Sequence, residues 1–150
     1  MADSAFREML DNIPAPTFET TAFTTPPPLD EATVAIVTSA GLHRPDQDGF
    51  GHQGDQSYRI LDAGDRNLKL GHWSPNFDRA GLTADLNVAY PADRLDELAA
   101  DGTIGGVGAH HLAFMGAQDE TMATIRMDTG PAAAQLLKED GVDVVLLTPV

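Results

Sequence analysis

The chain of 150 residues is 42% hydrophobic and 21% charged, which predicts a single globular domain with one hydrophobic core. Its 23 acidic and 9 basic residues give a formal net charge of −14, which disfavours binding to nucleic acid phosphates and to anionic membrane surfaces. The chain has no cysteine, which excludes disulfides, zinc–thiolate sites and a thiol nucleophile within these 150 residues.

Residues 1–28 are predicted to form a helix and an arm outside the main domain. Apolar side chains at helical spacing before Pro14 favour a short docking helix. Residues 14–28 contain five prolines and five threonines and should be extended, with Phe18 and Phe23 as anchors on the domain or on a partner. The chain has no basic segment followed by an apolar one at its start and no apolar run of about 18 residues, so we expect no signal peptide, no membrane span and a cytoplasmic protein.

Residues 29–150 are predicted to form one domain that begins with an apolar strand. The β-branched run at residues 33–38 favours a strand in the middle of a sheet, and the small residues after it allow a close approach to a ligand. A polar loop without apolar periodicity follows at residues 43–56. Short strands are expected at residues 57–61 and 67–72.

The second half of the chain alternates strand and helix patterns. Residues 83–90 alternate in polarity and are expected to form a strand, after which Pro91 opens a helix that Gly102 ends. Further elements are expected as a strand at residues 104–107, helices at residues 119–127 and 131–140, and a strand at residues 141–150. This order predicts an α/β fold with a layered, mainly parallel sheet and helices on both faces, Rossmann-like but not nucleotide-binding.

The closing stretch, Gly-Val-Asp-Val-Val-Leu-Leu-Thr-Pro-Val at residues 141–150, is apolar on both faces. Such a run is typical of a central parallel strand that is buried on both sides. Reactive groups gather just beyond the carboxyl ends of such strands. We therefore expect the chemistry of this protein directly after Val150.

The glycines near the middle of the chain do not form a nucleotide site. Gly106-x-Gly108 is followed by Ala-His-His, without a third glycine that opens a helix. A dinucleotide-binding loop requires that glycine for close packing of helix and strand. The glycines are better explained by a helix cap and a sharp exit from a strand.

The five histidines raise the question of a metal site. His110 and His111 lie on an extended segment and point to opposite faces, so the two cannot readily bind one ion together. A site made of His72, Asp55 and one of that pair would suit zinc or iron. The residues lack local ligand spacing, so no metal site is predicted.

Polar side chains gather in three places that could form one pocket. Asp55, Ser57 and Arg59 follow the long loop, and His72 lies at the end of an expected strand. Asp85 and Asn87 interrupt a segment that is otherwise apolar. Asp85 and Asn87 either bond to neighbouring backbone or to Arg94, or help to hold an amine or carboxylate substrate beside the strand end. Both alternatives fit the sequence.

Several segments are familiar when they are taken together and in order. They are residues 34–43 (Val-Ala-Ile-Val-Thr-Ser-Ala-Gly-Leu-His), 54–59 (Gly-Asp-Gln-Ser-Tyr-Arg), His72, 85–91 (Asp-Leu-Asn-Val-Ala-Tyr-Pro), 114–116 (Phe-Met-Gly) and 141–150. This series resembles the selenoprotein B family, which contains the catalytic subunits of glycine, sarcosine and betaine reductases and of D-proline reductase. The resemblance runs from about Pro28 to Val150.

The resemblance implies a nucleophile that this chain does not contain. In the family, a selenocysteine or cysteine follows the last strand and attacks the α-carbon of an amino acid or betaine, which displaces the amine. We therefore expect selenocysteine or cysteine immediately after Val150, with a UGA codon taken as a stop. No cofactor is expected to bind this chain directly. The resemblance also implies a partner reductase subunit that can carry a pyruvoyl group, a dithiol or thioredoxin-type reductant, and an oligomer.

The sequence thus supports a C–N-cleaving reductase subunit that is inactive as these 150 residues alone. Two alternatives stay open: a non-catalytic binding or regulatory subunit with the same pocket, and a metal-dependent hydrolase that uses His72 and Asp55. No catalytic residue is expected within the chain itself. The expected substrate-binding residues are Ser39, Gly41, His43, Asp55, Ser57, Arg59, His72, Asp85, Asn87, His111 and Met115.

Overall fold

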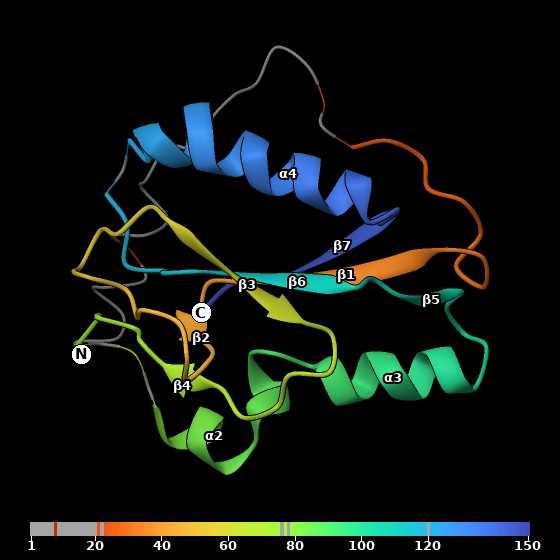
Figure 1. The fold of residues 1–150 in the computed structure, drawn as a ribbon, viewed down its shortest axis with the longest axis horizontal. Helices are drawn as coiled ribbons and strands as arrows, with labels where there is room; N and C mark the ends of the chain where they lie inside the picture. Colours follow the sequence, from red (N-terminus) through yellow and green to blue (C-terminus); the bar gives the residue numbers. More distant parts are fainter. Residues whose placement is uncertain (1–7, 9–20, 22, 76, 78, 120) are drawn as a thin grey trace.

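The computed structural model describes residues 8, 21, 23–75, 77, 79–119 and 121–150. Within these residues, five strands form one sheet, two short strands form another, and helices cover both faces of the larger sheet (Figure 1). In chain order the elements are β1 (Thr33–Thr38), β2 (Leu42–His43), β3 (Tyr58–Asp62), β4 (Lys69–Leu70), α2 (Arg79–Ala84), a 3₁₀ helix (Leu86–Val88), α3 (Ala92–Ala100), β5 (Gly106–Val107), β6 (His110–Phe114), a π-helical turn (Ile125–Thr129), α4 (Gly130–Glu139) and β7 (Val144–Thr148). The predicted α/β class with a mainly parallel sheet is confirmed.

The strand β1 lies in the middle of the larger sheet, as its β-branched sequence predicts. It pairs in parallel with β7, from Val34 opposite Val144 to Thr38 opposite Thr148. On its other side it pairs in parallel with β5 and then with β6, and β3 follows as an antiparallel neighbour of β6. The carboxyl ends of β1, β6 and β7 therefore lie at one edge of the sheet.

A helical layer lies against each face of the sheet (Figure 1), and apolar side chains fill the space between helices and sheet. On one face, Leu137 of α4 packs in a cluster with Ala35 and Leu112. On the other face, Leu82 of α2 and Leu95 of α3 belong to a larger cluster that includes Ile36 of the central strand. Each fully buried leucine contributes about 1.5–3 kcal/mol by leaving water. Packing on both faces holds the sheet in place, and with it the edge at which the parallel strands end.

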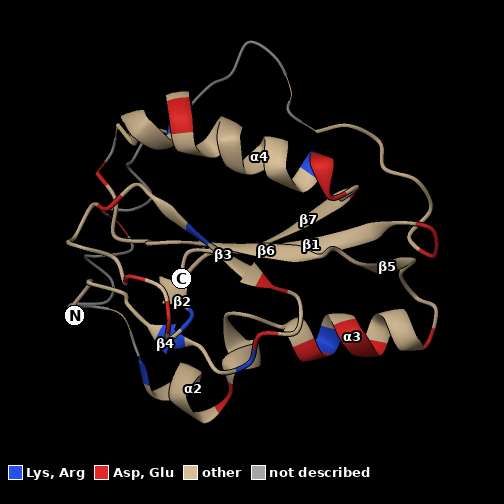
Figure 2. Ribbon diagram, viewed as in Figure 1, with Lys and Arg blue, Asp and Glu red and all other residues tan. Residues whose placement is uncertain are grey.

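The position of β7 shows that the prediction of a central, doubly buried strand at residues 141–150 is wrong. Among the described residues, β7 pairs with β1 alone and forms an edge of the sheet. Leu146 is 39% exposed and Leu147 is 68% exposed. An apolar run indicates that a strand avoids water, but it does not say which neighbour covers it. In Figure 2 the strand is seen to carry no charged side chain.

The prediction of a strand at residues 83–90 is also wrong, because this segment is helical. α2 ends at Ala84, and a 3₁₀ helix follows at Leu86–Val88. Leu82, Leu86 and Tyr90 all face the core, with the spacing of four residues that a helical segment produces. Asp85 interrupts the helix, since its side chain accepts a hydrogen bond from the backbone N–H of Asn87. The polar residues that suggested a strand are therefore a helix cap and its partner.

Other boundaries agree with the sequence or differ by a few residues. The helix from Pro91 ends before Gly102, whose φ is 78°, and the last helix ends before Gly141, whose φ is 72°. Phe23 is 78% exposed, so it does not anchor the arm on the described part of the domain. The predicted N-terminal helix and Phe18 lie outside the described residues. No helix within the described ranges is long and apolar enough to cross a membrane.

Candidate functional site

A cleft of about 530 Å³ lies at the carboxyl ends of β1, β6 and β7, where open α/β sheets bind their ligands. Apolar side chains from α2 and the 3₁₀ helix meet the backbone that follows β6 and β7. The lining residues are His72, Ser74, Phe77, Gly81, Leu82, Val88, Ala89, Gly116, Ala117 and Val150. Of these described lining residues, His72 alone has a side chain that titrates near neutral pH.

His72 is a buried, neutral imidazole in this cleft. The residue is 5% exposed, and its ring stacks on Phe77 with 4.3 Å between the ring centroids. Nδ1 accepts a hydrogen bond of 3.2 Å from the backbone N–H of Ser74, so the neutral ring carries its proton on Nε2. Burial, together with the positive charge of Arg79, lowers the pKa of His72 below its usual value. The ring is therefore neutral at pH 7.

Ser39 brings Val150 to the cleft by tying the end of β7 to the end of β1. The backbone N–H of Val150 donates to Ser39 Oγ at 2.9 Å, and Ser39 Oγ lies 3.3 Å from the carbonyl oxygen of Val150. One residue before Ser39, Thr38 Oγ1 donates to the carbonyl oxygen of Thr148. Ser39 therefore positions the strand end, next to which the sequence predicts the chemistry.

Gly41 places the backbone of His72 close to the turn after β1. Its φ is 67°, and its carbonyl accepts a hydrogen bond of 2.8 Å from the N–H of Gly71. A Cβ on Gly41 would lie 3.0 Å from the backbone nitrogen of His72. The close approach predicted for Gly41 therefore involves the protein's own backbone. His43 is buried, with Nδ1 3.0 Å from the carbonyl of Arg44, and it does not line the cleft.

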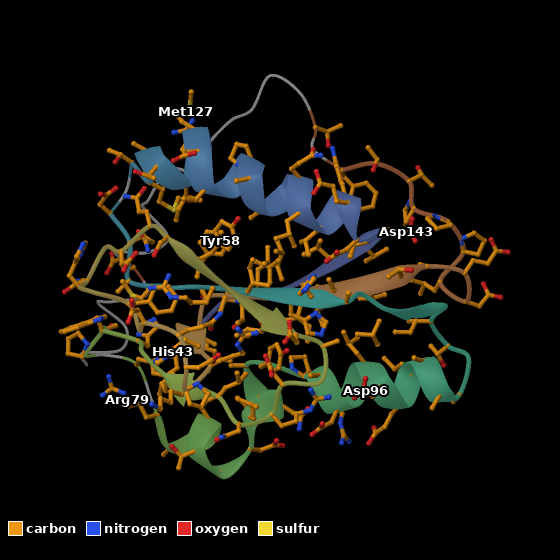
Figure 3. The ribbon with its side chains drawn as sticks, viewed as in Figure 1. His43, Tyr58, Arg79, Asp96, Met127 and Asp143 are labelled. Carbon is orange, nitrogen blue, oxygen red and sulfur yellow. The ribbon has the colours of Figure 1, made fainter. Side chains whose placement is uncertain are left out.

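Figure 3 shows how the side chains divide between the two faces of the sheet. His43 and Arg79 lie on the side that α2 and α3 cover, whereas Tyr58 lies on the side of α4 (Figure 3). Arg79 donates a hydrogen bond of 2.7 Å to the carbonyl oxygen of His72. The positive charge that acts on His72 is thus bonded to the backbone of the same residue.

Asp55, Ser57 and Arg59 organise the long loop. Asp55 accepts hydrogen bonds from the N–H of Gly51 at 2.8 Å and of Ser57 at 2.9 Å. Burial acts to raise the pKa of Asp55, but the hydrogen bonds from Ser57 and Gly51 outweigh it and lower the pKa. Arg59 donates to two loop carbonyl oxygens and stacks 4.4 Å from the ring of Phe50. These three side chains bond within the loop and do not line the cleft.

Asp85 and Asn87 form hydrogen bonds with neighbouring protein groups, which is the first of the two alternatives given for them above. Asp85 accepts from the backbone N–H of Asn87 at 2.9 Å, and Asn87 Nδ2 donates to Asp93 at 2.9 Å. Arg66 then bridges Asp93 and Asp96 with two ion pairs of 2.6 Å. This network joins the 3₁₀ helix to the start of α3 on the surface.

His111 and Met115 belong to the core. His111 is fully buried, and its Nδ1 accepts a hydrogen bond of 3.1 Å from the backbone N–H of Ile36. Burial lowers the pKa of His111 to about 4. Met115 is 1% exposed, and its sulfur accepts from the N–H of Ala117 at 3.3 Å. Neither side chain lines the cleft.

The histidine pair on β6 has two different environments, as predicted for opposite faces. His110 Nδ1 lies 2.7 Å from a carboxylate oxygen of Asp140 at the end of α4, whereas the ring of His111 packs edge-on against Tyr90. Within the described residues, no group of three or more histidine, cysteine or acidic side chains could hold a metal ion. The hydrolase alternative therefore has no metal centre in this part of the chain.

Sequence reasoning missed Phe77 and Gly116. Phe77 follows the sequence Ser-Pro-Asn, which gives no periodic pattern, and Gly116 stands out in the sequence only as part of Phe-Met-Gly. Both residues line the cleft next to His72. A glycine directly after a buried strand, where a Cβ would crowd a neighbour, is the signal that could have indicated Gly116.

Comparison with known proteins agrees with the resemblance described above. The sequence model of the glycine/sarcosine/betaine reductase selenoprotein B family matches residues 6–150. The chain is 35% identical over 134 residues to the D-proline reductase subunit gamma of Acetoanaerobium sticklandii. That match covers 83% of this chain and 54% of the relative, so the chain spans about half the length of the curated relative. No solved structure matches the chain.

Proposed function

The chain belongs to the glycine/sarcosine/betaine reductase selenoprotein B family, and we propose that it is a subunit of a reductase that cleaves a C–N bond of an amino acid or betaine. The match covers 54% of the D-proline reductase subunit, so the substrate and the partner subunits belong to this proposal. The proposal also includes a partner subunit that carries a pyruvoyl group and a dithiol or thioredoxin-type reductant.

The convergence of Val150 and His72 on one cleft carries the proposal. Ser39 bonds the end of β7 to the end of β1, so the chain after Thr148 runs into the cleft. His72 lies in the same cleft with its Nε2 atom buried and without a hydrogen-bond partner among the residues that the structure describes. A nucleophile placed next after Val150 would therefore enter a cleft that already contains a hydrogen-bond donor.

The proposed reaction replaces a C–N bond by a C–H bond. A selenolate or thiolate on the residue that follows Val150 attacks the carbon bonded to nitrogen, a carbon–chalcogen bond forms, and the amine leaves with its electron pair and takes up a proton. A dithiol then supplies two electrons, the carbon–chalcogen bond breaks, the carbon takes up a proton, and the dithiol becomes a disulfide. The pyruvoyl group of a partner subunit would activate the substrate.

His72 has a defined role in this proposal. Its neutral ring carries a proton on Nε2, so the ring donates a hydrogen bond and does not act as a base at pH 7. Such a donor stabilises negative charge on the substrate or on the nucleophile. Asp55, whose carboxylate bonds to Gly51 and Ser57 in the loop, has no part in it.

The test is C–N cleavage by the complex that contains this protein. The complex is purified from cells that make the protein naturally, and glycine, sarcosine, betaine and proline are supplied with a dithiol. We expect dithiol-dependent C–N cleavage of one of these substrates, with one disulfide formed for each bond broken. Binding of a substrate without cleavage would favour the alternative of a non-catalytic subunit and would contradict the proposal.

A further inference from the structure

The Nε2 atom of His72 is a buried donor without an acceptor in the described residues. The side chain is almost fully buried, yet Nε2 has no hydrogen-bond partner, whereas Nδ1 is occupied by Ser74. An unsatisfied buried N–H costs about 1–3 kcal/mol. A site that retains such a donor is prepared for an acceptor that arrives with a ligand.

The charges around this donor favour an anionic acceptor. Arg79 lies close enough for its positive charge to act on His72, and it donates to the carbonyl of that residue. The described residues that line the cleft include no aspartate and no glutamate. A carboxylate oxygen is therefore the favoured partner of the Nε2 proton.

Gly116 brings an acceptor next to that donor. A Cβ built on this glycine would lie 2.7 Å from the carbonyl oxygen of Val150 and 2.9 Å from His72 Nε2. Both distances are shorter than a carbon atom tolerates, so the lack of a side chain lets the two groups approach the same point. A hydrogen-bond donor on the ligand would thus find the carbonyl of Val150 beside the imidazole.

We propose that the cleft binds an α-amino acid that retains an N–H group, with its carboxylate on His72 Nε2 and its nitrogen donating to the carbonyl oxygen of Val150. This inference deepens the proposed function and rests on it for the choice among substrates. Betaine carries a carboxylate but no N–H, so it makes only the first of these contacts. Within the family's substrates, the pair of contacts selects amino acids over betaine.

The apolar wall of the cleft narrows the choice further. Phe77, Leu82 and Val88 give the cleft an apolar wall, in which the ring of Phe77 stacks on His72. A hydrocarbon ring buried there leaves water, which contributes about 25 cal/mol for each Å² of apolar surface. Glycine offers no hydrocarbon for this contact. Proline combines an N–H, a carboxylate and an apolar ring, and is therefore the best probe of the site.

The test uses the long-range proton–nitrogen NMR signals of His72 in protein labelled with ¹⁵N-histidine. Proline, glycine, betaine and acetate are titrated separately. We expect proline to shift the Nε2 signal of His72 at concentrations about tenfold lower than betaine or acetate, since it makes one more hydrogen bond and buries its ring. An equal or stronger response to betaine or acetate would overturn the inference, as would a His72 signal that no amino acid shifts.

Variants separate the roles of donor and glycine. His72→Phe keeps an aromatic ring against Phe77 but removes the donor, and it should abolish the preference for proline over pyrrolidine, which lacks the carboxylate. His72→Gln retains an N–H at the Nε2 position and should partly restore proline binding. Gly116→Ala should weaken proline binding at least tenfold. Gly64→Ala is the control, because nothing lies within 4 Å of the added carbon in a turn remote from the cleft.

The two proposals fail separately. If His72 does not respond to amino acids in a complex that still cleaves C–N bonds, the proposed binding mode is contradicted but the reductase proposal stands. If His72 responds to proline in a complex that cleaves no C–N bond, the reductase proposal is contradicted but the proposed binding mode stands. A Gly116→Ala protein that does not fold leaves the decision to the His72 variants.

Discussion

Ser39 holds Val150 through its hydroxyl group, which accepts the backbone N–H of Val150 at 2.9 Å and lies 3.3 Å from its carbonyl oxygen. The two residues are separated by 111 positions in the sequence and join the carboxyl ends of β1 and β7. Because the carbonyl oxygen of Val150 and His72 Nε2 both lie next to Gly116, this link helps to fix the polar end of the cleft.

Replacement of Ser39 by Ala should loosen this strand end. The free energy of unfolding should fall by about 1 kcal/mol, the usual net contribution of such hydrogen bonds. The amide of Val150 should lose protection in hydrogen exchange. Ser39→Thr keeps the hydroxyl group and is the matched control. Unchanged protection of Val150 in Ser39→Ala would show that the hydroxyl group does not hold the strand end.

His111 should make stability depend on pH between about 7 and 4. Its folded-state pKa of about 4 lies below the usual value of 6.5, so the unfolded chain binds the proton more tightly. The stabilisation is complete above the unfolded pKa and is lost as the pH falls towards 4, with a total of about 3 kcal/mol. Urea unfolding at a series of pH values measures this loss.

Acidic residues titrate in part of the same range, so the comparison uses His111→Asn. Asparagine offers an oxygen to the N–H of Ile36 but does not titrate. The wild-type protein should lose stability relative to this variant as the pH falls from 7 to 4. Parallel pH profiles for the two proteins would mean that His111 is protonated equally in the folded and unfolded states.

Gly105 and Gly106 offer a matched pair next to β1. A Cβ on Gly105 would lie 2.6 Å from the carbonyl oxygen of Glu31 and 2.8 Å from the nitrogen of Ala32, whereas nothing lies within 4 Å of one on Gly106. Gly105→Ala should therefore reduce the free energy of unfolding by about 1–3 kcal/mol. Gly106→Ala should change it by less than about 0.5 kcal/mol. Equal denaturation midpoints for the two variants would contradict this packing.

Asp55 should act on the loop and not on the cleft. Asp55→Asn weakens the hydrogen bonds from Gly51 and Ser57, so the amides of these two residues should exchange about tenfold faster. Binding of proline at His72 should be unaffected. A variant that keeps loop protection but loses proline binding would restore the role in substrate binding that the sequence suggested for Asp55.

The sequence predicts those parts of the fold whose local pattern and tertiary position agree. β1 is β-branched and lies in the centre, and α3 runs between a proline and a glycine that limit it. β7 is different, because its apolar residues fit an edge as well as a centre, and it pairs with residues of β1 that lie 110 positions earlier in the chain. The alternation at residues 83–90 misleads because Asp85 caps a helix there.

The site could be predicted only in part. The rule that ligands gather at the carboxyl ends of parallel strands points to the edge of the sheet where the candidate cleft lies, and His72 lines that cleft. Most of the other polar candidates form hydrogen bonds within the protein. Asp55 and Arg59, for example, both bond within the long loop, which the sequence does not reveal. The contact of Phe77 with His72 could not be predicted, because the sequence around Phe77 shows no apolar periodicity.

The most direct test of a reductase centre at the ends of β1, β6 and β7 is the turnover of the native complex that carries His72→Phe, relative to wild type. Wild type should cleave a C–N bond of proline with a dithiol as reductant. The variant should lose at least about 100-fold in turnover, the usual effect of removing a donor that stabilises developing charge, while its Tm stays within a few degrees. Equal turnover in the two complexes would place the reaction elsewhere and contradict the account.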